Sequence, residues 1–371
     1  MGQERFKRVG ESSFFGRMVY DRVIPRDHFL MRLNEIIPWQ RLTYKLVKYY
    51  RGGAKEGRPP YEPALLLKML LVSFLYNLSE RQVEEVANFN LAVKCFLGLA
   101  ADELAPDHST LTAFKGRIVE NGKLGAYEKL LTEIVAIGRE AGIRFGSIQV
   151  LDSVHSIADV NVEKDEARQH KGGKPPRDVS ARWGVKGSFW SRDENGKKVR
   201  QKKSFHGYKA HVSLNAQTGL ITSMTHTPGN AYDGHQLPAL LEKDLAQGLP
   251  VDTVTADCGY DDSDNHVLLA AKGIHSAIRL NRYRTRKKDP HKDVWLRLMA
   301  TPQYEQGLKE RYKIERKFGE AKQQHGLRRC RYLGLIRYAI QGFLTAIALN
   351  VKRMVLLLTG VPFKGRASAL A

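Results

Sequence analysis

Cysteine is scarce in this chain, with three in 371 residues: Cys95, Cys258 and Cys330. An odd number at such wide spacing indicates neither a disulfide framework nor a zinc site, and it fits a reducing cytosol. The first residues also lack the apolar core of a signal peptide, so we expect a cytoplasmic protein. The longest apolar region, 339–358, is interrupted by Asn350, Lys352 and Arg353. This pattern favours a buried helix over a membrane span and predicts no membrane partner.

Negative charge is also in short supply. Lys and Arg outnumber Asp and Glu by 60 to 39, which gives a formal net charge of +21. Residues 271–371 hold 23 Lys and Arg against six Asp and Glu, so most of the excess lies in the last quarter. Such a surplus suggests a polyanionic partner, most commonly the phosphate backbone of nucleic acid. The alternative is a generally basic protein, but uniformly distributed charge would not concentrate at one end.

The length of the chain predicts two domains or one elaborated domain. Residues 1–60 look like an arm followed by a helix, and they end at a linker rich in Gly and Pro. Residues 61–143 contain several short helices. These could be a helix-turn-helix module that contacts DNA, or only a packing and dimerisation unit. The pattern changes near Phe145, and we expect a second domain over 144–358 and a tail over 359–371.

The second domain alternates strands with helices. Apolar runs predict strands at 147–152, 206–214, 220–226, 251–256 and 276–280, with helices between and after them. The order β-β-β-α-β-α-β-α predicts an α/β domain with a mixed five-stranded sheet and helices on its faces.

A basic insertion at about 163–203 is too long for a simple strand connection. It is rich in Lys, Arg and Gly and contains Arg182, Trp183 and Trp190. It could order on DNA and stack on an unpaired base. The alternative is a solvated, partly disordered loop.

Three acids stand in settings suited to holding a metal. Asp152 and Asp257 each end a predicted strand, and Glu315 lies in a helical, strongly basic stretch. Acids gathered at strand ends and on a neighbouring helix can hold two Mg²⁺ ions, which together can cleave a phosphodiester bond. Taken singly, an Asp after a strand is more often a turn residue or a helix cap.

Four nearby acids are weighed against these three. Glu320 lies five residues after Glu315, which turns it about 140° away on a helix, so it is expected to form a salt bridge instead. Asp261 and Asp262 are expected to cap the next helix. Asp233 is expected to cap its own helix, with a supporting role near the site as the alternative.

Several motifs carry a family resemblance. Arg311, Glu315 and Lys322 fit the last three positions of the pattern Tyr-x2-Arg-x3-Glu-x6-Lys, and Leu308 stands where the Tyr would be. Asp257 is followed by Cys-Gly-Tyr-Asp, and Gly-Tyr-Lys (207–209) and Pro-Gly-Asn (228–230) precede it. With these motifs in this order, the chain resembles the DDE transposases of bacterial insertion sequences. Residues 61–117 resemble the N-terminal domain often found on such enzymes, so the resemblance covers nearly the whole chain.

The resemblance implies an RNase H-like catalytic domain, preceded by an all-α N-terminal domain, in an enzyme that cleaves DNA strands and transfers them. Asp152 would bridge two Mg²⁺ ions, with Asp257 and Glu315 flanking and Mn²⁺ able to substitute. The partners would be transposon-end and target DNA, bound by a homodimer or a higher assembly near the bacterial nucleoid.

The basic and aromatic side chains near these acids are expected to contact DNA. For Arg311 the alternative is an i,i+4 ion pair with Glu315. Two other functions remain open: a structure-specific nuclease or resolvase that does not join strands, and a domesticated DNA-binding protein without chemistry. The expected DNA contacts are Arg311, Lys322, Arg328, Arg329, Arg331, Lys209, Arg182, Trp183 and Trp190.

Overall fold

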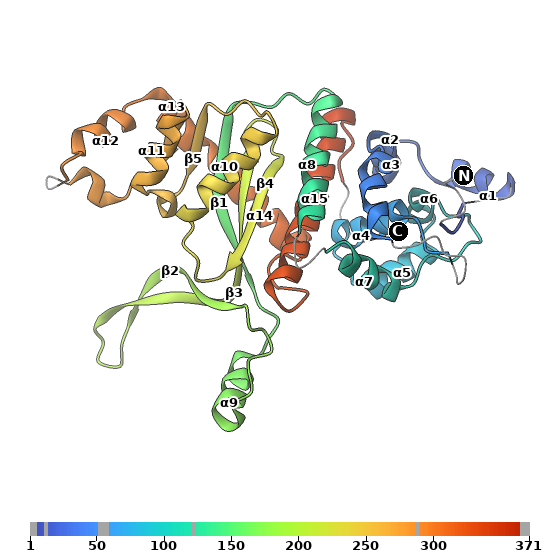
Figure 1. Cartoon of the computed structure of the whole chain (residues 1–371), viewed down its shortest axis with the longest axis horizontal. Helices are drawn as coiled ribbons and strands as arrows, with labels where there is room; N and C mark the ends of the chain where they lie inside the picture. The colour runs from blue at the N-terminus through green and yellow to red at the C-terminus, as the bar shows by residue number, and fades with distance from the viewer. Residues whose placement is uncertain (1–5, 11–13, 51–58, 120–123, 287–288, 364–371) are drawn as a thin grey trace. The chain divides into compact units, whose positions relative to one another are not determined.

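The computed structural model describes residues 6–10, 14–50, 59–119, 124–286 and 289–363. The chain divides into two compact units, one of residues 1–144 with 343–371 and one of residues 145–342 (Figure 1). The sequence-based boundary near 144 lies at the same place. The sequence analysis predicted a second domain that reaches residue 358. The structure instead groups the residues after Gly342 with the first unit. Most of the predicted linker (51–60) and most of the predicted tail lie outside the described residues.

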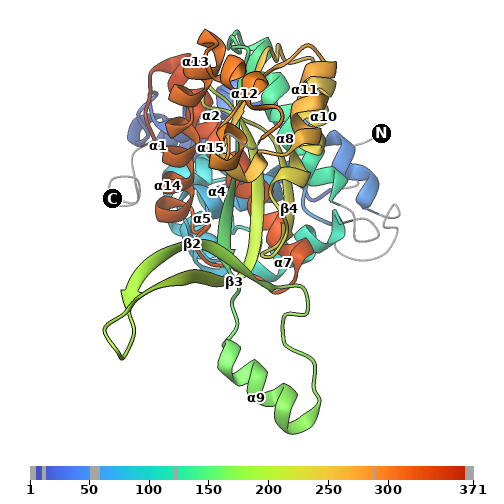
Figure 2. The same ribbon diagram turned by 90° about the vertical axis from the view of Figure 1, so that its left-hand side faces the viewer.

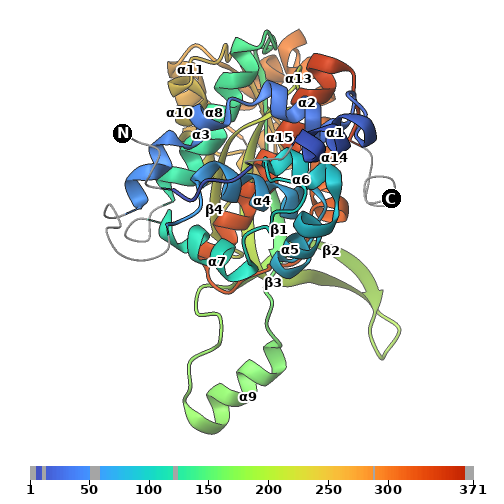
Figure 3. The ribbon, with the colours of Figure 1, turned by 90° about the vertical axis from the view of Figure 1, so that its right-hand side faces the viewer.

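The described part of the first unit consists of helices packed around α4 (Pro63–Leu75) (Figure 3). Twelve of the 13 residues of α4 are buried, because the helix is apolar on all sides. The next helix, α5 (Glu80–Phe89), opens with a capping box, in which Ser79 and Gln82 bond each other's backbone N–H groups. The other elements are α1 (Phe14–Val23), α2 (Phe29–Ile36), α3 (Trp39–Thr43), η2 (Tyr44–Tyr49), α5 (Glu80–Phe89), α6 (Leu91–Leu97), α7 (His108–Arg117) and α8 (Gly125–Glu140).

The long carboxy-terminal helix α15 (Leu335–Thr359) belongs to both units. Its length and hydropathy would allow it to cross a membrane, but 72% of its most apolar window is buried inside the protein. Its second half packs on α8, where a Cβ on Gly138 would lie 3.5 Å from Met354 Cε. That packing is why the second half groups with the first unit. The predicted buried helix over 339–358 is confirmed.

The sequence predicts five strands, but the second unit is built on a mixed six-stranded sheet. Its strands β4, β3, β1, β5 and β6 lie in this order, and β2 (Arg182–Arg192), from the basic insertion, also pairs with β3. β1 pairs antiparallel with β3 and parallel with β5. The β3–β4 pair is antiparallel and the β5–β6 pair is parallel. This is the RNase H-like arrangement, so the predicted fold class is confirmed. The strands are β1 (Ile148–Ile157), β3 (Lys198–Asn215), β4 (Ile221–Pro228), β5 (Thr253–Ala256) and β6 (His275–Ile278).

Helices flank this sheet. α10 packs on β3 and β4, α11 packs on β6, and α13 crosses β5 and β6. The crossing of α13 is close, since a Cβ on Gly307 would lie 2.4 Å from the Cβ of Ala277. Only glycine therefore fits at this position. The elements are η3 (Gly234–Gln236), α10 (Leu237–Ala246), η4 (Cys258–Tyr260), α11 (Ser263–Ala271), η5 (Arg282–Thr285), α12 (Lys292–Met299), α13 (Pro302–Glu310) and α14 (Tyr312–Gln324).

The basic insertion is folded. It forms α9 (Val162–Gly172), β2 (Arg182–Arg192) and the first half of β3, and the β2–β3 hairpin extends beyond the rest of the sheet (Figure 2). Asp193 closes the turn, because its side chain accepts hydrogen bonds from the backbone N–H groups of Asn195 and Lys197. The hypothesis of a partly disordered loop is therefore wrong. A register shift between Val185 and Gly187 leaves one extra residue in β2, a β-bulge.

Candidate active site

The sheet brings Asp152 and Asp257 together. β1 does not end at Asp152, as the sequence predicted, but continues to Ile157 because it keeps pairing with β3. The parallel ladder between β1 and β5 does end here, and its last pair is Leu151 with Ala256. The two acids are therefore the next residues on adjacent parallel strands. Both side chains are partly exposed.

The two carboxylates repel each other. Burial and the charge of Asp257 raise the pKa of Asp152 to about 7, against the attraction of Arg311. Burial also raises the pKa of Asp257. Among the described side chains, no close ion pair neutralises either acid. Because the two carboxylates lack a close cation in the described part of the chain, a divalent metal ion bound between them would stabilise their ionised forms.

Glu315 lies in the first turn of α14, and its side chain is 63% exposed. Its Oε1 is 4.0 Å from Arg311 Nη2, which is the i,i+4 pairing considered as the alternative. Within the described residues, no three His, Cys, Asp or Glu side chains are grouped so that they could hold a metal. The structure therefore brings two of the three predicted acids together and places the third at the edge of the site.

An i,i+4 spacing suggests one helix for Arg311 and Glu315, but the two residues do not lie in one uninterrupted helix. Arg311 is the single residue between α13 and α14, and its own backbone is in the right-handed helical region (φ −58°, ψ −33°). Its guanidinium acts on both Asp152 and Asp257, lowering the pKa of each against the effect of burial. Its Nε is buried and has no hydrogen-bond partner among the described residues. Arg311 is thus a cation at the site that is not fully bonded.

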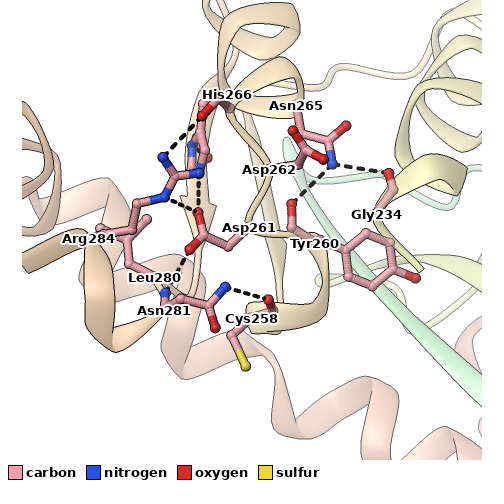
Figure 4. A network of polar contacts seen from close by, with 12 residues as sticks. Gly234, Cys258, Tyr260, Asp261, Asp262, Asn265, His266, Leu280, Asn281 and Arg284 are labelled. Carbon is pink, nitrogen blue, oxygen red and sulfur yellow. Dashed lines mark hydrogen bonds and ion pairs between the residues drawn. The ribbon is translucent and has the colours of Figure 1, made fainter. Parts of the chain in front are cut away.

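Glu320 bonds Lys317 Nζ at 3.3 Å and lies 3.9 Å from His325 Nε2, so its expected role as a salt-bridge partner is confirmed. Asp262 caps α11 as expected, since it accepts a hydrogen bond from Asp264 N. Asp261 does not cap that helix. It is buried and instead accepts bonds from Arg284 Nε, His266 Nε2 and the backbone N–H of Asn281 (Figure 4).

A group of cations borders the acids. Lys322 Nζ lies 3.4 Å from His155 Nδ1 on β1. Burial, Lys186 and Arg328 lower the pKa of Lys322 to about 8, while Asp152 opposes the shift. Burial and four lysines (Lys322, Lys186, Lys209 and Lys203) lower the pKa of His155 to about 4. Clustered like charges are unfavourable in the protein alone and suit a polyanion. The sequence analysis missed Lys186 and Lys203, which only the hairpin brings here.

The other expected DNA contacts lie on the segment after α14 and on β2. Ile157 at the end of β1 forms a parallel bridge with Arg329, which holds the arginine-rich segment beside the strand. Arg328 is exposed, Arg329 is exposed and bonds Asp159, and Arg331 is partly buried. Arg182 Nη1 donates to backbone carbonyls of its own loop. Trp183 and Trp190 are 53% and 69% exposed on the hairpin.

The pKa of Asp152 leads to a testable pH dependence. An Asp that ionises near pH 3.9 in the unfolded chain and near 7 in the folded one stabilises the fold fully below the lower value. That contribution is lost as pH rises to about 7. Asn cannot ionise, so Asp152→Asn should raise Tm over wild type more at pH 8 than at pH 5, in the presence of a chelator. Thermal denaturation at both pH values measures this, and a Tm difference that does not change with pH would contradict it.

Comparison with known proteins identifies the family. Residues 18–117 match the family described as "Transposase domain (DUF772)", and residues 165–351 match "Transposase DDE domain". The second match covers half of the chain and includes Asp257 and Glu315, while Asp152 precedes it.

Two solved transposase structures resemble the chain. The piggyBac transposase synaptic complex with hairpin DNA is 11% identical with a TM-score of 0.41, over 98% of this chain and 81% of that one. The Mos1 transposase paired-end complex with left transposon end is 14% identical with a TM-score of 0.20, over 76% and 84%. Likeness at this level carries no weight beside the family match. The chain belongs to the family of transposases with a DDE catalytic domain.

Proposed function

We propose that this transposase binds the terminal inverted repeats of a bacterial insertion sequence and catalyses metal-dependent cleavage and strand transfer. One observation carries the proposal: Asp152 and Asp257 are neighbours on parallel strands, repel each other, and are bordered by clustered cations. Carboxylate oxygens suit Mg²⁺, with Mn²⁺ as a substitute. The clustered cations would attract the DNA phosphates that must approach the metal. We expect the enzyme to act in the cytoplasm, as a dimer or larger assembly on DNA.

In this proposal the acidic residues bind the metal and the basic residues bind the DNA. Asp152 and Asp257 would hold the metal, and Glu315 would join them from the first turn of α14. Bound there, two Mg²⁺ ions supply activation of water or a 3′-hydroxyl and stabilise the departing 3′-oxygen. Lys322 and Arg328 would hold the phosphates of the strand being cut. Arg311, whose Nε lacks a hydrogen-bond partner among the described residues, can bond a phosphate oxygen without giving up an existing bond.

Glu315 and Glu320 provide a direct test of the third acid. Glu315→Gln should reduce cleavage of transposon-end DNA by about 100-fold or more, because the substitution removes a charged metal ligand. Glu320→Gln should retain most of the activity, since its carboxylate already pairs with Lys317 and His325. Both variants are compared in single-turnover cleavage at saturating DNA. The reverse ranking would transfer the role to Glu320.

Strand transfer separates this proposal from a nuclease or resolvase on the same fold. The protein is incubated with the DNA that flanks its own gene, with and without Mg²⁺, and the cut ends are mapped. Discrete 3′ ends at the element boundary, joined to a target plasmid, support a transposase. Cutting without joining would favour the nuclease. Binding without cutting at any metal concentration would favour a domesticated DNA-binding protein.

A further inference from the structure

An ion pair between Lys209 and Asp233 lies next to the site acids. Asp233 Oδ1 accepts a hydrogen bond from Lys209 Nζ at 2.8 Å, and Asp233 Oδ2 accepts one from Ser153 Oγ at 2.8 Å. Ser153 also donates its backbone N–H to Asp152 Oδ1 at 2.7 Å. Hydrogen bonds therefore connect Lys209, through Asp233 and Ser153, to the carboxylate of Asp152. The side chain of Asp233 makes no capping bond to η3, so the cap predicted from the sequence is wrong.

The same pair contributes to the charge of the site. Burial is the main reason that the pKa of Asp257 is raised; Asp233 adds to the shift and Lys209 opposes it. The hydroxyl of Tyr260 is buried, with no hydrogen-bond partner among the described residues. Its pKa is raised first by burial and then by Asp233, Asp152 and Asp257. The three carboxylates thus all act on one buried hydroxyl, and Lys209 forms an ion pair with Asp233.

The backbone holds this arrangement together. Asn265 on α11 donates from its Nδ2 to the carbonyl of Tyr260 and to the carbonyl of Gly234, each at 3.0 Å (Figure 4). Asn265 is buried, so both bonds are shielded from water. One side chain therefore ties the turn after Asp257 to the turn after Asp233. The position of Asp233 relative to the site is fixed by the fold as well as by its own ion pair.

We propose that Lys209 and Asp233 act as a positioning pair for the metal ligands. Asp233 orients Asp152 through Ser153, and Lys209 keeps the pair neutral, so that the charge offered to a metal comes from Asp152 and Asp257. This inference rests on the proposed function. Lys209 is then a structural cation of the site, because its ammonium already bonds Asp233 and the Ala231 carbonyl. Removing only the acid leaves a cation beside the metal ligands, which opposes binding of a second cation.

The test is a double-mutant cycle of Asp233→Asn and Lys209→Met. Mn²⁺ alone is the probe, and it is titrated into the full-length protein without DNA. Asp233→Asn should weaken Mn²⁺ binding about tenfold and raise the Mg²⁺ needed for half-maximal cleavage by a similar factor. Lys209→Met should bind Mn²⁺ as well as wild type or better. The double variant should return to within about threefold of wild type. A merely structural role makes the double variant no better than Asp233→Asn, and that result would overturn the proposal.

A matched control comes from the first unit. Glu80 and Lys115 form an ion pair whose side chains are 17% and 8% exposed, close to the 19% and 14% of Asp233 and Lys209. Glu80→Gln should lower Tm and leave Mn²⁺ affinity unchanged. Asp152→Asn is included to separate the two hypotheses. If that variant loses Mn²⁺ binding while Asp233→Asn does not, only the positioning pair is refuted. If Asp152→Asn binds Mn²⁺ like wild type, the proposed metal site fails and the positioning pair fails with it.

Discussion

Asp152→Asn is expected to reduce strand cleavage at a transposon end by about a thousandfold or more, while the Kd for the same DNA changes by less than about threefold. Burial and then the charge of Asp257 raise the pKa of Asp152 to about 7, and Asp152 lies where the parallel β1–β5 ladder ends. Asn keeps the shape and the bond from Ser153 but removes the charge that a metal requires. Cleavage is measured at saturating DNA and Mg²⁺, and binding is measured without metal.

The matched control for Asp152 is another buried acid in the same unit. Asp244 on α10 accepts a hydrogen bond from Ser213 Oγ at 2.5 Å, and burial raises its pKa to about 6. Asp244→Asn should therefore change stability but leave the cleavage rate close to wild type below its Tm. If Asp152→Asn cuts as fast as Asp244→Asn, Asp152 is not a metal ligand.

Shortening the β2–β3 hairpin is expected to weaken binding of transposon-end DNA by about 10–100-fold with little change in Tm. Gly187 and Lys203 pair directly, so residues 188–202 can be replaced by a two-residue Asn-Gly turn. The change removes exposed Trp190 and five cations, but no residue of the core sheet. The slope of log Kd against log salt should fall by about 0.9 for each phosphate that the shortened protein no longer neutralises. The cations removed are Arg192, Lys197, Lys198, Arg200 and Lys202.

Point substitutions separate stacking from charge. Trp190→Ala should account for part of the weaker binding, about 1–3 kcal/mol if a base stacks on the indole. Val199→Ala, on the opposite face of the hairpin, should bind like wild type. Equal affinity of the shortened protein and wild type over the full salt range would show that the hairpin does not contact this DNA.

The sequence predicts the elements whose residues face a core. The sequence predicts the buried strands β4, β5 and β6, in which Thr and Ser stand among the apolar residues, and the step from Ala256 to Asp257 marks a strand end correctly. The hairpin was missed because most of its side chains are exposed on both faces, so no apolar alternation marks it. Its turn residues, Asp193 to Gly196, were the available signal.

The arrangement within the site could not be predicted from the sequence. No Gly or Pro stands next to Arg311 to mark the turn between α13 and α14. A motif spacing treats Arg311, Glu315 and Lys322 as one helix and misses this turn. The bond between Asp233 and Ser153 joins residues 80 positions apart and depends on the pairing of β1 with β3. Local pattern contains no information about such contacts.

The bulge at Lys186 has a consequence for the two hairpin tryptophans. Seven positions separate Trp183 from Trp190, and in an uninterrupted strand an odd separation points two side chains to opposite sides. The extra residue restores an even count, so Trp183, across from His206, and Trp190, across from Arg200, project from one side of the ribbon. Inserting or deleting a single codon between them would therefore point the two tryptophans to opposite sides of the ribbon, although both residues would still be present.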